Sequence, residues 1–172
     1  YDFRDGSIVP TDTDGKKDIS YGGLTIKVGT KNAFKYNDAA HGVRFNDGNA
    51  LEIAVSGPTK ITLGGCQYSA TGTITATSAD GSYSETKDAK TKDCYHNASK
   101  YTNEDDYSIS FSYNGDAATI ITLAFSNQTY VPCLAVTAIT EDIADNNGAV
   151  KDSVAVYNFS DGSVLPTTID SV

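Results

Sequence analysis

The sequence predicts an all-β fold built from antiparallel sheets. Apolar and polar side chains alternate along several short segments, which is the pattern of strands with one buried face. The chain contains 15 glycines, and no long stretch repeats apolar residues at the helical spacing. At 172 residues the chain is long enough to bury a single core without disulfide staples.

Short alternating segments define about nine strands. In chain order they are expected at 24–28, 34–36, 43–45, 51–55, 61–63, 73–77, 107–113, 121–126 and 134–138. Gly57-Pro58 predicts a turn before 61–63, and Asn114-Gly115 predicts a hairpin between 107–113 and 121–126. Tyr107 and Tyr113 share the parity of apolar neighbours, so both are expected in the core.

A two-sheet β-sandwich of the jelly-roll type is the commonest way to close this many short strands. An immunoglobulin-like sandwich is the alternative. The chain has no Trp, which weakens the antibody-type version, because that core is built on a buried Trp beside a disulfide.

Similar 11-residue sequences occur near both ends of the chain. YDFRDGSIVPT at 1–11 recurs as YNFSDGSVLPT at 157–167, so the sequence resembles one unit of a tandem array in a longer protein. We expect a sandwich module at 1–139, a polar linker at 140–153 and the first strand of the next repeat at 154–172. That last strand could instead pair with its own module or complete a neighbouring molecule by strand addition.

Three cysteines allow one disulfide within the chain. Cys66 and Cys94 both lie where a strand gives way to a loop, and we expect them to pair, leaving Cys133 as a thiol in mid-strand. Three reduced, buried thiols are the alternative. The spacing of Cys and His contains no zinc pattern.

The net charge of −9 disfavours nucleic acid and anionic membranes as partners, since both require a cationic surface. No apolar run approaches the roughly 20 residues that span a bilayer. The segment 83–107 is the longest without a strand pattern, and it carries Lys87 and Lys90 as well as later lysines, so we expect a binding loop there. No nucleophile elbow, metalloprotease helix or phosphate loop is present, which predicts a protein that is not an enzyme.

Four separated motifs carry a family resemblance: residues 41–45 (HGVRF), 64–68 (GGCQY), 94–96 (CYH) and 129–132 (TYVP). With them, the chain from about Leu24 to Ile139 resembles non-catalytic β-sandwich modules that accompany bacterial pectate lyases and pectin esterases. The resemblance implies a carbohydrate-binding module that holds the catalytic domains of its parent chain on plant cell-wall polysaccharide, outside the cell or on its surface.

If the polysaccharide is pectin, its carboxylates need basic side chains and its sugar rings need flat aromatic surfaces. Arg44 alternates against Val43 and Phe45, so it should point to solvent or into a groove. The candidate ligand-binding residues are His41, Arg44, Tyr68, Lys92, Tyr95, His96 and Lys100. Tyr83 and Tyr101 are further ring candidates. The alternatives are that these tyrosines pack at the edge of the core and that His41 only holds a loop.

Two alternatives remain open at this point. Asp12 and Asp14 resemble the opening of a calcium loop, although Gly23 stands where the bidentate Glu would fall, so structural Ca²⁺ is a candidate ligand. A module of another class would explain the repeat equally well: a spacer repeat of a bacterial surface protein or adhesin that binds no glycan.

Overall fold

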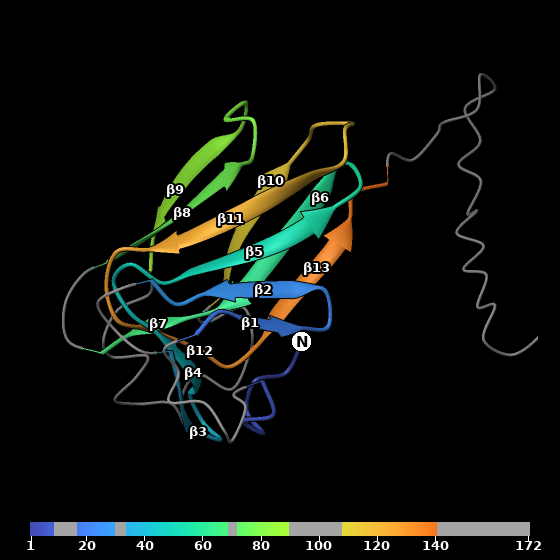
Figure 1. Cartoon of the computed structure of the whole chain (residues 1–172). Coiled ribbons are helices and arrows are strands. Elements are labelled where there is room, and N and C mark those ends of the chain that lie inside the picture. The colour runs from blue at the N-terminus through green and yellow to red at the C-terminus, as the bar shows by residue number, and fades with distance from the viewer. Residues whose placement is uncertain (9–16, 30–33, 69–71, 90–107, 141–172) are drawn as a thin grey trace, which may run out of the picture. The chain divides into compact units, whose positions relative to one another are not determined.

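A computed structural model describes residues 1–8, 17–29, 34–68, 72–89 and 108–140 of the chain (Figure 1). These residues form 13 strands, and all the strand pairs among them are antiparallel. Tyr1–Thr140 form one compact unit. The predicted linker after Thr140 and the predicted next strand at 154–172 lie outside the described residues. None of the described residues belongs to a helix of membrane-spanning length and apolarity.

The largest sheet has six strands, ordered β1-β2-β5-β11-β8-β9. Their bounds are β1 (Ile19–Tyr21), β2 (Leu24–Lys27), β5 (Ala50–Val55), β11 (Thr119–Phe125), β8 (Thr73–Ser78) and β9 (Ser84–Asp88). At its centre Leu51 lies opposite Leu123, and Ile53 lies opposite Ile121. These apolar pairs face one side because a strand turns successive side chains to opposite faces.

A three-stranded sheet, β10-β6-β13, forms a layer behind β5 and β11 (Figure 1). It consists of β10 (Ser108–Tyr113), β6 (Thr59–Gly64) and β13 (Leu134–Ala138). Its inward side chains join those of the six-stranded sheet in one buried cluster, which contains Ile61, Phe111 and Leu123 among others. Complete burial of an aliphatic side chain of this size contributes about 1.5–3 kcal/mol to folding, so this shared cluster is the main stabilising element.

A four-stranded sheet, β3-β4-β12-β7, lies at the end of the molecule opposite the β8–β9 turn (Figure 1). It consists of β3 (Lys35–Asp38), β4 (Gly42–Phe45), β12 (Thr129–Val131) and β7 (Cys66–Gln67). Phe45 ties this sheet to the six-stranded one, because its ring stacks on Phe125 of β11 at 4.3 Å and 13°.

The strand pairs are nested along the sequence. β5 pairs with β11, β6 pairs with β10, and β8 pairs with β9, so the first strand of this series meets the last. Two short connections cross between the six-stranded and the three-stranded sheet: Ser56–Pro58 from β5 to β6, and Asn114–Ala118 from β10 to β11. The second crossing corrects the predicted hairpin at Asn114-Gly115, since the strands on its two sides belong to different sheets.

Several further predictions are corrected. The strands β1, β7, β9 and β12 were not predicted, and β9 occupies the start of the segment expected to be a long loop. Cys133 directly precedes β13 and is not in mid-strand. The face predicted for Leu134, Val136 and Ala138 is buried only at Leu134, because the rest of β13 is exposed. Tyr113 is buried in the core as predicted, whereas Tyr107 lies outside the described residues.

Candidate binding site on the four-stranded sheet

Arg44 and Tyr130 lie side by side on one face of the four-stranded sheet. Lys35 of β3 is in register with Arg44 of β4, and Arg44 is in register with Tyr130 of β12. Residues directly opposite each other in antiparallel strands point to the same face. The row continues along the backbone to Cys66 of β7, which is in register with Tyr130.

The other face of this sheet points into the core. Val43, Phe45 and Val131 are all fully or almost fully buried in the hydrophobic cluster. The ring of Phe45 also lies 5.1 Å from that of Phe34. This anchoring fixes the parity of β4, so Arg44 must project from the non-core face, as the alternation in the sequence predicted.

The turn between β3 and β4 holds His41 through Asp38. The Asp38 carboxylate accepts hydrogen bonds from the amides of Ala40 and His41, both at 2.9 Å, and from Nδ1 of His41 at 2.7 Å. A carboxylate only accepts, so Nδ1 of His41 carries the proton. Burial alone would raise the pKa of the Asp38 carboxyl, but the hydrogen bonds from His41 and Ala40 outweigh it and hold the pKa below its usual value.

Gly42 is required at the start of β4. Its φ is +68°, which is costly for residues with a side chain. A Cβ at this position would also collide with the backbone of Val131 and Pro132. The glycine therefore lets β4 approach β12 closely, and this brings His41 to Tyr130.

Tyr130 connects two of the predicted ligand residues. Its ring lies 5.9 Å from that of His41 in an edge contact and 6.2 Å from that of Tyr68. Tyr130 is only 3% exposed, yet it does not belong to the hydrophobic core cluster. Tyr68, in contrast, is 41% exposed. The three rings thus form an aromatic group on the non-core face, with Tyr68 at its open side.

Arg44 completes this group with an unsatisfied donor. The side chain is half-buried, and its Nε atom is buried without a hydrogen-bond partner among the described residues. A buried donor left unpaired costs about 1–3 kcal/mol, and more when it is charged. A guanidinium of this kind suits a carboxylate, which it can bind through two parallel hydrogen bonds.

The structure therefore brings three predicted site residues, His41, Arg44 and Tyr68, to one face around Tyr130. The remaining predicted residues lie outside the described ranges: Lys92, Tyr95, His96 and Lys100 for the ligand, Asp12 and Asp14 for calcium, and Cys94 of the expected disulfide with Cys66. Within the described residues, no group of three or more His, Cys, Asp or Glu side chains could hold a metal ion.

Two residues of the expected binding loop have structural roles instead. Tyr83 packs against the core with its ring 5.8 Å from that of Tyr113, and its hydroxyl donates to Glu85 at 2.8 Å. Burial and the Glu85 carboxylate raise the pKa of Tyr83 well above its ordinary value. Lys87 of β9 donates to the Ser110 carbonyl, lies 5.4 Å from the Phe111 ring centroid and pairs with Glu85 at 3.0 Å. Both side chains hold β9 against the core.

Sequence reasoning missed Tyr130 as a site residue. Thr129, Tyr130 and Val131 are all buried, so the three-residue strand β12 shows no alternation of polar and apolar side chains. The available signal was the β-favouring Thr-Tyr-Val run before Pro132.

No family model matches this chain, and no curated protein matches it.

Proposed function

We propose that this chain carries a non-catalytic carbohydrate-binding module that binds the carboxylated polysaccharide of plant cell walls, pectin. The site is the face formed by His41, Arg44, Tyr68 and Tyr130. The observation that carries the proposal is the buried Arg44 Nε, which lacks an acceptor among the described residues. A uronate carboxylate bound at the half-buried guanidinium would supply that acceptor once the Arg44 side chain turns its Nε–H toward the open side of this face.

The charges near the site support an acidic ligand. A protein of net charge −9 repels a polyanion at long range, so binding requires a local cation. Arg44 supplies it, and the exposed Lys35 lies next to Arg44 in register. The half-exposed ring of Tyr68 offers a flat surface for the apolar face of a pyranose.

The carboxylate of Asp38 beside the aromatic group also supports binding without catalysis. The Asp38 carboxylate is hydrogen-bonded to His41, and its pKa is lowered by the hydrogen bonds that fix the turn. A carboxyl held ionised in this way is poorly suited to donate a proton to a glycosidic oxygen. Asp38 therefore serves to position His41.

The fold and the family resemblance point the same way. We propose a jelly-roll type of β-sandwich, which the nested pairing of β5 with β11 and β6 with β10 supports. Of the motifs that resemble the modules of pectin-degrading enzymes, 41–45, 64–68 and 129–132 supply β4, β7 and β12 of one sheet. We place the module in an extracellular or cell-surface protein beside catalytic domains of the same chain.

Affinity electrophoresis tests this proposal. The chain is run through gels that contain homogalacturonan of low or high esterification, xyloglucan or no polymer, each with and without a chelator. Retardation by low-ester pectin alone is expected. Arg44→Gln should abolish that retardation, whereas Lys60→Gln, which removes one charge from the exposed side of β6, should preserve it. A chelator should have no effect if the guanidinium binds the carboxylate directly.

The alternative function is a spacer repeat of a surface protein. The recurrence of the sequence 1–11 at 157–167 supports it equally well, because tandem repetition serves a stalk as well as a binder. Unretarded migration in every gel would reject the pectin proposal and favour the spacer.

A further inference from the structure

We propose that residues 157–164, the second copy of the repeated sequence, can bind where residues 1–8 bind. One module of this sequence can then receive a strand from the second copy. The acceptor is called the first-strand slot. It comprises the backbone of 132–134, the turn glycine Gly22, and the side chains of Tyr21 and Tyr36.

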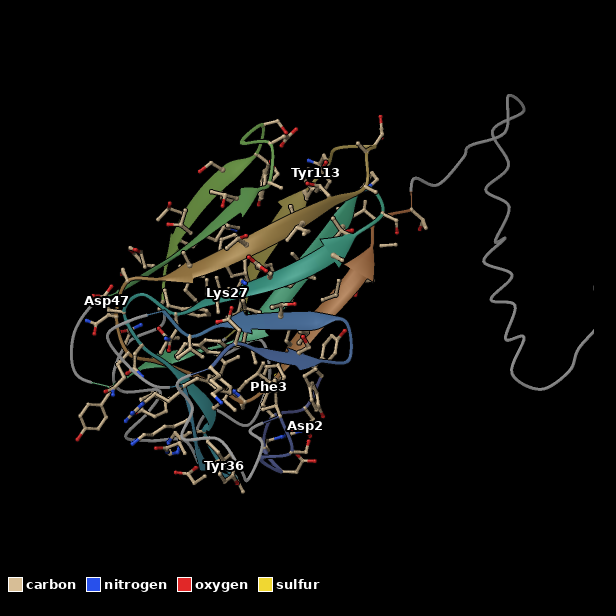
Figure 2. The ribbon with its side chains drawn as sticks, in the orientation of Figure 1. Asp2, Phe3, Lys27, Tyr36, Asp47 and Tyr113 are labelled. Carbon is tan, nitrogen blue, oxygen red and sulfur yellow. The ribbon has the colours of Figure 1, made fainter. Side chains whose placement is uncertain are left out.

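The backbone of the first residues extends the sheet at β13. Leu134 N donates to Tyr1 O at 2.9 Å, Tyr1 N donates to Leu134 O at 2.6 Å, and Phe3 N donates to Pro132 O at 2.8 Å. An amide at position 157 could make the same bond as the amino group of Tyr1. Figure 2 shows Asp2, Phe3 and Tyr36 at the same end of the molecule. Addition of a strand to a free sheet edge is a general mode of peptide recognition.

Side chains of the first copy then fix the register. Phe3 is completely buried, and Ile8 is 1% exposed. The Tyr1 hydroxyl donates to Gly22 O at 2.6 Å, and the Ser7 hydroxyl lies 2.9 Å from that of Tyr21. Gly6, with φ of +74°, rests against the ring of Tyr36, where a Cβ would crowd the ring atoms.

The second copy preserves the residues that make these contacts. Tyr157, Phe159, Gly162 and Ser163 are identical to Tyr1, Phe3, Gly6 and Ser7, and Val164 replaces Ile8. The two unlike replacements are Asn158 for Asp2 and Ser160 for Arg4. Asp2 and Arg4 form an exposed ion pair with each other at 2.7 Å, and such pairs contribute little to stability. The replacements thus spare the buried contacts and remove both partners of one surface pair.

The geometry of the slot provides a covalent test. Asp2 lies opposite Cys133, and its neighbours Tyr1 and Phe3 make the backbone hydrogen bonds to Leu134 and Pro132. Asp2 and Cys133 are therefore a non-hydrogen-bonded pair, whose side chains approach closely. A thiol at position 2 should therefore form a disulfide with Cys133 under mild oxidation. The Asp2→Cys chain is the positive control. In the proposal, position 158 takes the place of position 2.

The test uses the full chain with Asn158→Cys, alone and together with Phe3→Ala, under mild oxidation. Peptide mapping locates the disulfide, and gel mobility separates bonds within one chain from bonds between two chains. A bond between positions 158 and 133 is expected. Its yield should rise about tenfold or more with Phe3→Ala, because the first copy then loses its largest buried side chain. Adding Phe159→Ala should return the yield to the level of Asn158→Cys alone.

A bond to Cys133 either within or between chains supports the proposal. If Asp2→Cys crosslinks and Phe3→Ala with Asn158→Cys does not, the slot does not accept the second copy and the proposal is wrong. If Phe3→Ala has no cooperative melting transition, Phe3→Leu replaces it as the milder variant. The outcome is independent of pectin binding, because the slot shares no residue with the site around Arg44.

Discussion

The centre of the six-stranded sheet and the non-core face of the four-stranded sheet bury side chains of different kinds. Between β5 and β11 the buried side chains are all apolar, and the residues between them along each strand are more exposed. On the four-stranded sheet, the non-core face buries Tyr130 beside His41 and the Nε of Arg44. Apolar burial explains the first region by folding alone. The second region holds a polar group whose burial opposes folding, which is the feature expected of a binding site.

The largest effect should come from breaking the junction between the two regions. Phe45→Ala removes a fully buried ring that stacks on Phe125, and it should lower the free energy of unfolding by about 3–5 kcal/mol. Chemical denaturation monitored by tyrosine fluorescence measures the loss. Val136→Ala, at a position 36% exposed, is the control and should change stability by about 1 kcal/mol or less. A similar loss of unfolding free energy in both variants would contradict the role of Phe45 in joining the two sheets.

The next effect concerns the close approach of β4 to β12. Gly42→Ala should cost about 3 kcal/mol or more, because it adds a collision with the Val131 and Pro132 backbone to the cost of a positive φ. Gly48→Ala is a matched control. Gly48 has a φ of +83°, but a Cβ added there would meet no atom within 4 Å, so its loss should be about 1 kcal/mol. Equal losses of stability in Gly42→Ala and Gly48→Ala would show that β4 does not approach β12 as closely as described.

A third substitution separates binding from folding. Arg44→Met keeps much of the side-chain volume and removes the unpaired donor, so the free energy of unfolding should stay the same or rise by up to about 1 kcal/mol. Lys60→Met, at an exposed position of β6, should change it by about 0.5 kcal/mol or less. Thermal melts of both variants provide the comparison. A clear loss of stability in Arg44→Met would mean that the guanidinium supports the fold.

The smallest expected effect is the pH dependence of the β3–β4 turn. The pKa of Asp38 is lower in the folded chain than its usual value, so its ionised form contributes stability above about pH 4. That contribution is lost as pH falls through the lowered pKa. Asp38→Asn should therefore be less stable than the wild type at neutral pH and show a shallower loss between about pH 4 and pH 2. Parallel curves for the two proteins would reject this role, and Asp116→Asn is the exposed control.

The sequence predicted much of the first region and only part of the second. Clear alternation located β5, β10 and β11, because each has one buried and one exposed face. β12 is buried at every residue and β9 is largely polar, so neither shows that contrast in a form that predicts a strand. A turn signal such as Asn114-Gly115 is local, and it does not tell whether the chain returns to the same sheet.

The candidate site was predictable to the same degree. The outward direction of Arg44 was predicted from its alternation with Val43 and Phe45, which is a property of one strand. Tyr130 reaches the site only through the pairing of β12 with β4, which joins residues far apart in the chain. The bond from His41 to Asp38 gives His41 the structural role that was one alternative, while its contact with Tyr130 keeps it in the candidate site.

The most direct test follows the Nε–H resonance of Arg44 by ¹H–¹⁵N NMR during titration with a short oligogalacturonate and with its methyl ester. We expect a saturable shift of that resonance with the free acid, and little change with the ester, because the ester lacks the carboxylate that would accept the hydrogen bond. An unchanged Arg44 resonance at saturating acid, or an equal shift with both ligands, would contradict the proposed carboxylate site.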